Sequence, residues 1–302
     1  MTALTDVRGP AGASLLLTKP SGVRAAKNVA ATVLVTLAFL IALIPLLWIL
    51  GVVISRGAHL LTSADWWGLS QRGITTRRVG GGAYHAILGT LLQAAVTAVI
   101  SVPIGILTAI YLVEYGRGRL ARAVSFMVDI LTGVPSIVAG LFIYAVWVTT
   151  FGLQRVGFAV CLALVLLMVP VIVRSTEEML KLVPNDLREA SFALGVPKWK
   201  TIASIVLPTA LSGIITGVML GLARVMGETA PLLILGPYNS AISADLFGGN
   251  MATLPTMINQ NRNDLALEPA FDRVWSAALT LILIVLLLNI AARVTARFAK
   301  VS

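Results

Sequence analysis

Two charged side chains lie four residues apart inside a long apolar stretch of this 302-residue sequence. The stretch runs from Leu207 to Leu235, and the charged residues are Arg224 and Glu228. A charge at the centre of a bilayer costs about 2.5–3.5 kcal/mol even on a lenient insertion scale, so such residues face a protein interior or water. Their spacing predicts that both side chains lie on one helix face and contact each other.

Three roles for this pair remain open from the residues alone. It could be a structural ion pair that locks its helix to a neighbour through Asp129. Alternatively, Arg224 lines a pathway and offers its guanidinium to an oxyanion, while Glu228 orients it and keeps the net charge low enough for release. The third role is a proton relay, which is less favoured because the chain has no further series of acidic residues to pass a proton along. Because Asp129 lies nearer the expected cytoplasmic end of its helix, we expect it to act in gating or partner pairing.

The elements that must position these charges are membrane-spanning helices. Hydrophobic residues make up 58% of the chain and charged residues only 12%, far fewer charges than in a soluble domain. Apolar blocks of 18 or more residues predict transmembrane helices. We expect six such helices, which makes the chain an all-α integral membrane protein. The expected spans are 29–54, 84–113, 123–149, 156–173, 209–236 and 274–298.

The distribution of Lys and Arg predicts the orientation of these helices, because cytoplasmic loops carry the excess of positive charge. With both termini in the cytoplasm, fifteen basic residues lie on that side and seven on the other. The segment 55–83 fits poorly, since it would lie outside and yet contains four arginines. Basic residues that flank helices account for most of the net charge of +10, so no nucleic-acid partner is needed. We expect residues 1–28 to form a disordered cytoplasmic tail and residues 29–302 the transmembrane domain.

The third expected span contains residues that weaken a helix. Gly133, Pro135 and Gly140 leave backbone groups that neighbours or a cavity must satisfy. The hydroxyl of Ser136 could face a pathway or bond back to its own helix.

Several kinds of site are absent from the sequence. It contains no G-x-x-x-x-G-K-[ST] phosphate loop and neither a G-x-S-x-G nor an H-E-x-x-H motif. The single cysteine, Cys161, allows no intramolecular disulfide. We therefore expect no catalytic residue, metal or cofactor on this chain, and any energy from ATP must come from another subunit.

The segment 174–208, between the fourth and fifth spans, predicts a helix–turn–helix on the cytoplasmic side. Gly195 suits the left-handed position that ends a helix, and Pro197 suits the start of the next. The stretch E-A-S-F-A-L-G-V-P-K-W-K-T-I-A-S-I-V-L-P resembles the EAA loop of ABC importer permeases. The matching positions are Glu189, Ala190, Ser191 (where the family has Ala), Gly195 and Pro208. The resemblance implies a type I importer fold and a coupling helix that docks on a separate ATPase subunit.

The stretch G-L-A-R-V-M-G-E-T-A-P-L-L (221–233) resembles the corresponding segment of phosphate ABC transporter permeases, with an ending similar to the PstA type. Residues 81–91 and 129–141 are similar to the same family. The resemblance implies that Arg224 and Glu228 act in phosphate movement. It also implies a second permease of the PstC type, two ATPase subunits holding ATP and Mg²⁺, an external phosphate-binding protein and a location in the inner cell membrane. The alternatives are a permease for molybdate or sulfate, and a membrane scaffold for phosphate sensing.

Overall fold

The computed structural model describes residues 22–298, with side chains up to residue 294, and every regular element in this range is a helix. The all-α prediction is therefore confirmed. The longer helices are α1 (Gly22–Leu61), α3 (Tyr84–Ile110), α4 (Gly118–Gly133), α6 (Gly157–Lys181), α9 (Leu207–Met226) and α12 (Glu268–Phe298). The shorter helices are α2 (Ala64–Gly68), α5 (Ser136–Ile143), α7 (Asn185–Ala193), α8 (Lys198–Thr201), α10 (Ala230–Leu235) and α11 (Leu254–Asn261). Short π-helical segments, η1 (Tyr111–Tyr115), η2 (Tyr144–Thr150) and η3 (Ile202–Val206), and the 3-10 turn η4 (Arg262–Asp264) adjoin them.

The chain divides into two compact units, Met1–Gly51 and Val52–Ser302. The first unit contains most of α1, which begins at Gly22 and so takes in seven residues of the expected tail 1–28. Ala25, Ala26 and Lys27 are good helix formers, which accounts for the earlier start. The rest of the expected tail, residues 1–21, lies outside the described residues.

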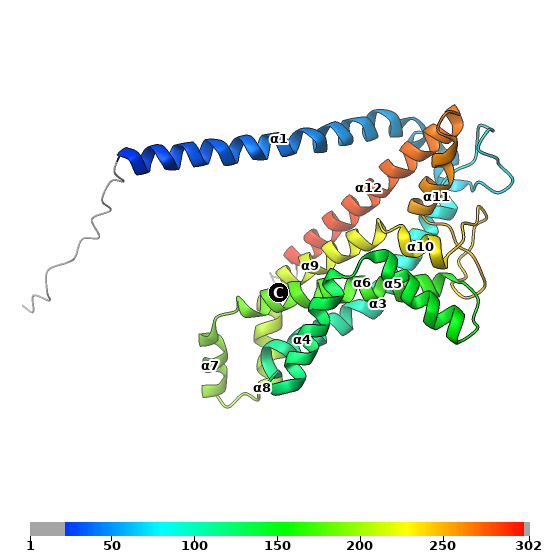
Figure 1. Cartoon of the computed structure of the whole chain (residues 1–302). Helices are drawn as coiled ribbons and strands as arrows, with labels where there is room; N and C mark the ends of the chain where they lie inside the picture. The colour runs from blue at the N-terminus through cyan, green and yellow to red at the C-terminus, as the bar shows by residue number, and fades with distance from the viewer. Residues whose placement is uncertain (1–21, 299–302) are drawn as a thin grey trace, which may run out of the picture. The chain divides into compact units, whose positions relative to one another are not determined.

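The core of the second unit is the packing of α3 against α6, with α9 beside them (Figure 1). Along α3 a buried residue recurs every fourth position, in the order Gly89, Gln93, Thr97, Ser101, Gly105 and Ala109. All of these except Gln93 are small, and small residues at this spacing let two transmembrane helices approach closely. A methyl group added at Gly105 would lie 2.6 Å from Cγ2 of Ile172 on α6. The two helices therefore pack too tightly for a larger side chain at this point.

The third expected span, 123–149, is not one helix. Helix α4 ends at Gly133, α5 begins at Ser136, and the two parts are bent by 109°. Pro135 has no N–H to continue the helix and restricts Val134 to an extended conformation, which breaks the span here. Five helices are long and apolar enough to cross a membrane, and the bent pair makes six if it counts as one span.

The fifth expected span, 209–236, is also shifted. The helix runs without interruption from Lys198 to Met226 through α8, η3 and α9. A π-helical turn precedes Pro208, which suits a residue that cannot donate the regular backbone hydrogen bond. The chain leaves the helix at Gly227 and resumes as the separate helix α10. The sixth span starts at Glu268 rather than at 274.

The second unit has two distinct ends: α7 and α8 lie at one and α11 at the other (Figure 1). At the α11 end, Arg273 is only 3% exposed and holds the arginine-rich segment 70–82. Its guanidinium donates hydrogen bonds to the main-chain carbonyls of Thr75 (3.2 Å), Gly80 (3.0 Å) and Arg78. Arg273 therefore fixes part of the segment whose charges fit the orientation rule poorly.

Candidate functional site

Arg224 and Glu228 meet, but not on one helix face. Arg224 lies in the last turn of α9, whereas Glu228 lies in the break before α10. The chain turns at Gly227, where the N–H of Gly227 bonds to the Arg224 carbonyl at 3.1 Å. The Arg224 Nε lies 3.8 Å from the Glu228 Oε1, which is an ion pair too long for a hydrogen bond. The prediction of a shared helix face was wrong because the helix ends between the two residues.

Arg224 keeps its hydrogen-bonding capacity free. Its side chain is 49% exposed and that of Glu228 only 15%. No hydrogen bond joins the guanidinium to any other residue in the described part of the chain. A guanidinium has five N–H donors in a planar fork, which fits the oxygens of a carboxylate or phosphate. The pair therefore consists of an accessible cation and a more buried carboxylate beside it.

The broken third span positions the break that contains Glu228. Helix α10 packs on α5, where a methyl group added at Gly140 would lie 2.9 Å from the Cα of Pro231. Only a glycine lets the two backbones come this close. Ser136 begins α5 and is partly buried, and no hydrogen bond links it to Arg224 or Glu228. Its predicted role in the pathway remains a prediction.

Asp129 belongs to a different cluster. Its Oδ1 lies 2.5 Å from Nη2 of Arg174 on α6, and the same guanidinium donates to the carbonyl and hydroxyl of Ser125 on α4 at 3.0 Å. Arg174 also pairs with Glu177 at 2.5 Å. The suggested pairing of Asp129 with Arg224 was wrong, because Asp129 instead ties α4 to α6. The sequence did carry a signal for part of this cluster, since Arg174, Glu177 and Lys181 are spaced at i, i+3 and i+7 on one helix face.

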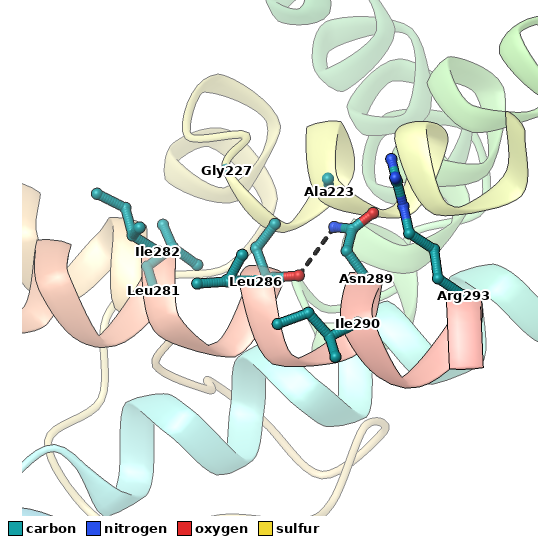
Figure 2. A pocket seen from close by; sticks show the side chains of 9 residues that line it. Ala223, Gly227, Leu281, Ile282, Leu286, Asn289, Ile290 and Arg293 are labelled. Atoms are coloured by element: carbon teal, nitrogen blue, oxygen red, sulfur yellow. Dashed lines mark hydrogen bonds between the residues drawn. The ribbon is translucent and has the colours of Figure 1, made fainter. Parts of the chain in front are cut away.

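An open groove lies beside the charged pair. Its lining includes Ala223 and Gly227, the neighbours of Arg224 and Glu228, and a face of α12 from Leu281 to Arg293. The groove has a volume of about 680 Å³ and is lined mainly by apolar side chains (Figure 2). Asn289 and Arg293 add polar groups on α12, and the Asn289 amide bonds back to the carbonyl of Val285 at 2.8 Å. The groove thus runs along the side of α9 that carries Ala223 and Gly227, the residues next to Arg224 and Glu228 in the sequence.

The predicted helix–turn–helix is present as α7, a turn and α8; we call residues 185–201 the coupling hairpin. Gly195 has φ +75°, the left-handed conformation expected of it. Ser191 is 3% exposed, and its hydroxyl lies 2.8 Å from that of Thr201, which joins the two arms. This contact gives a physical reason for Ser where the family pattern has Ala. Glu189 and Ala190 are exposed, as is Pro208 further along the helix.

The tip of the coupling hairpin carries unpaired apolar side chains. Leu194 is 82% exposed and Trp199 is 65% exposed. Apolar residues gathered at an exposed tip are typical of a surface that binds a partner.

Comparisons with known proteins agree with this architecture. Residues 101–300 match the family described as "Binding-protein-dependent transport system inner membrane component". The chain is 55% identical over 269 residues to the phosphate transport system permease protein PstA 1 of Mycobacterium tuberculosis (strain ATCC 25618 / H37Rv). The aligned residues cover 89% of this chain and 87% of the relative. It is 41% identical over 299 residues to the phosphate transport system permease protein PstA of Yersinia pestis, with 98% of each chain covered.

Two solved structures are similar in fold. A chain of a bacterial alginate ABC transporter, solved with its pentasaccharide-bound periplasmic protein, aligns with a TM-score of 0.59 at 15% identity over 92% of this chain and 96% of that chain. A chain of the inward-facing MetNI methionine ABC transporter aligns with a TM-score of 0.56 at 21% identity over 72% and 94%. At these identities the likeness concerns the fold, and it confirms the predicted ABC importer architecture. Since the family match spans well over half of the sequence and the relatives are this similar, the chain belongs to the binding-protein-dependent transport system inner membrane components.

Proposed function

We propose that this chain is the permease subunit of an ABC importer for inorganic phosphate, driven by ATP hydrolysis on separate subunits. The observation that carries the proposal is the half-exposed guanidinium of Arg224, which stands at a helix break in an apolar region with its donors free. The similarity to PstA proteins at 55% and 41% identity supports phosphate as the substrate.

Arg224 would bind phosphate through charge-assisted hydrogen bonds, the stronger kind of hydrogen bond in proteins. Glu228, 3.8 Å away, lowers the net positive charge of the site, so that a bound anion can leave again. A purely structural ion pair fits this geometry less well. At that separation and exposure such a pair contributes at most about 1 kcal/mol to stability.

The other subunits would occupy different parts of the chain. A second permease of the PstC type would complete the pathway along the open groove beside Arg224. Two ATPase subunits would dock on the coupling hairpins of the two permeases, and an external phosphate-binding protein would dock at the α11 end. In this arrangement the protein is a multi-pass protein of the inner membrane with both termini in the cytoplasm, as the distribution of basic residues favours.

An anion panel tests the substrate. The assembled complex with its binding protein, reconstituted in vesicles, should take up labelled phosphate, and excess sulfate or molybdate should not compete. Uptake of sulfate or molybdate in preference to phosphate would contradict the assignment. ATPase activity without transport of any of these anions would favour the sensing scaffold.

A substitution at the hairpin tip tests ATPase docking. Leu194→Asp places a charge in the proposed interface and should abolish co-purification of the ATPase while leaving membrane levels unchanged. Leu182→Asp is the matched control, because Leu182 is 73% exposed at the end of α6, outside the coupling hairpin. Equal loss of ATPase from both variants would mean that the tip is not the docking point.

A further inference from the structure

A nearly buried ion pair joins the coupling hairpin to the end of α3. Glu114 lies in η1, the turn that ends α3, and its side chain is 7% exposed. Arg188 lies on α7, directly before the EAA-loop residue Glu189, and is 13% exposed. Both Nη2 (2.8 Å) and Nε (3.1 Å) of Arg188 donate to Oε1 of Glu114. The residues are 74 positions apart, so this contact connects two separate parts of the chain.

The same guanidinium also binds the end of α6. Nη1 donates to the carbonyl of Val183 at 2.7 Å, and Nη2 donates to that of Leu180 at 3.0 Å. Carbonyls at a helix C-terminus lack partners within their own helix and need donors from elsewhere. Arg188 therefore fixes α7 against the ends of both α6 and α3.

The second arm of the coupling hairpin reaches the same point on α3. Lys198, the first residue of α8, donates to the main-chain carbonyl of Glu114. Its Nζ also lies 4.9 Å from the centre of the Tyr115 ring, within the range of a cation–π interaction. The arms are joined to each other through Ser191 and Thr201. Both arms of the hairpin are therefore anchored to residues 114–115.

Helix α3 can carry a displacement from this point across the whole unit. It packs tightly on α6 along its small-residue face. Near its other end the Thr90 hydroxyl accepts a hydrogen bond from the N–H of Leu254, the first residue of α11, at 2.9 Å. A closely packed helix moves as a body because interiors of native density deform little.

We propose that Glu114 is the positioning residue through which ATP-driven movement of the coupling hairpin reaches the membrane helices. This inference rests on the proposed function, since it requires ATPase subunits docked on the hairpin. Glu114 touches no substrate. Its carboxylate holds Arg188, beside the main-chain contact of Lys198, so that α3 follows the hairpin instead of staying behind.

The test compares phosphate transported with ATP hydrolysed in the same reconstituted vesicles. The variants are Glu114→Gln, Arg188→Gln, the double variant, and Arg188→Lys, which keeps the charge but loses the forked contact. Glu178→Gln is the matched control, because Glu178 is exposed on α6 and forms no ion pair among the described residues. Co-purification of the ATPase is measured for each variant.

We expect Glu114→Gln and Arg188→Gln to keep the ATPase bound and hydrolysing ATP. The phosphate moved per ATP should fall about tenfold, within the range of measured coupling between distant sites. The double variant should be no worse than either single variant, as for two residues that act as one unit. Arg188→Lys should retain part of the coupling.

Three results would overturn the inference: an unchanged ratio of phosphate to ATP, loss of ATPase binding in step with uptake, or losses that multiply in the double variant. An unchanged ratio would mean that Glu114 does not transmit the movement. Loss of ATPase binding would mean that Glu114 and Arg188 belong to the docking surface. Multiplying losses would mean that the two residues act independently of each other. If the unmodified complex and Glu178→Gln transport no phosphate, the proposed function itself fails. If both transport it normally and Glu114→Gln does too, only this inference fails.

Discussion

Replacing Arg224 with Gln separates a transport role from a structural one. Gln is polar and can still donate through its amide, but it carries no charge and no planar fork of five donors. The substitution therefore removes the charge-assisted, forked contact proposed for phosphate, with little change in the polarity of the surface next to the groove. The Arg224 side chain forms no hydrogen bond with any described residue, so the substitution breaks no side-chain hydrogen bond within this part of the protein.

The geometry gives two different magnitudes. An ion pair of 3.8 Å with one partner 49% exposed contributes about 0–1 kcal/mol, so the thermal stability of the complex should hardly change. A hydrogen bond to a charged group contributes about 1.5–3 kcal/mol. Because every 1.4 kcal/mol is a factor of ten, uptake should fall roughly ten- to a hundredfold.

The assay is uptake of labelled phosphate by cells or vesicles at limiting phosphate, with membrane level, ATPase association and melting temperature measured in parallel. Arg119→Gln serves as the control, since Arg119 is an exposed arginine in the first turn of α4 and its side chain forms no ion pair among the described residues. Phosphate uptake by Arg224→Lys should lie between that of Arg224→Gln and that of the control, because a lysine keeps the charge and loses the forked arrangement of donors.

Unchanged uptake in Arg224→Gln would refute the role given to this residue. A fall in uptake that follows an equal fall in stability or assembly would instead restore the structural ion pair. Only reduced uptake by a stable, fully assembled complex agrees with the reasoning.

Three further substitutions test the architecture. Gly105→Leu should destabilise the complex by about 1–3 kcal/mol, the usual cost of overpacking, because even a methyl group at this position would lie 2.6 Å from Ile172. Gly68→Ala is the control and should be tolerated in the same thermal melts, because the space around its Cβ is open. Gly195→Val should weaken ATPase co-purification, since φ +75° costs a residue with a side chain about 1–2 kcal/mol; normal co-purification would mean that the turn can adjust. Arg273→Gln should speed tryptic cleavage after Arg77 and Arg78, because it releases carbonyls that now hold segment 70–82; an unchanged cleavage rate would mean that this segment is held by other contacts.

Much of this protein could be predicted from local sequence patterns. Apolar blocks located the helices, because in a bilayer the backbone must satisfy its hydrogen bonds within each span. Gly195 was placed correctly in the left-handed region, since glycine adopts it at least cost. Arg224 and Glu228 were identified as a pair because charges in an apolar run are rare.

The positions of the helix breaks could be predicted only in part from the sequence. Pro135 was recognised as weakening the third span, yet the size of the bend, 109°, depends on how α5 packs against α10. Likewise the end of α9 at Met226 moved Glu228 off the helix of Arg224. A four-residue spacing predicts a contact only while the helix continues.

The sequence by itself determined the all-α class, the positions of the apolar spans, the coupling hairpin and the identities of the charged residues. Tertiary structure alone decided which charges meet: Asp129 with Arg174, and Glu114 with Arg188 across 74 residues. Helical periodicity describes neighbours within one helix. It carries no information about which helix ends come together, because that depends on how closely α3, α4 and α6 pack.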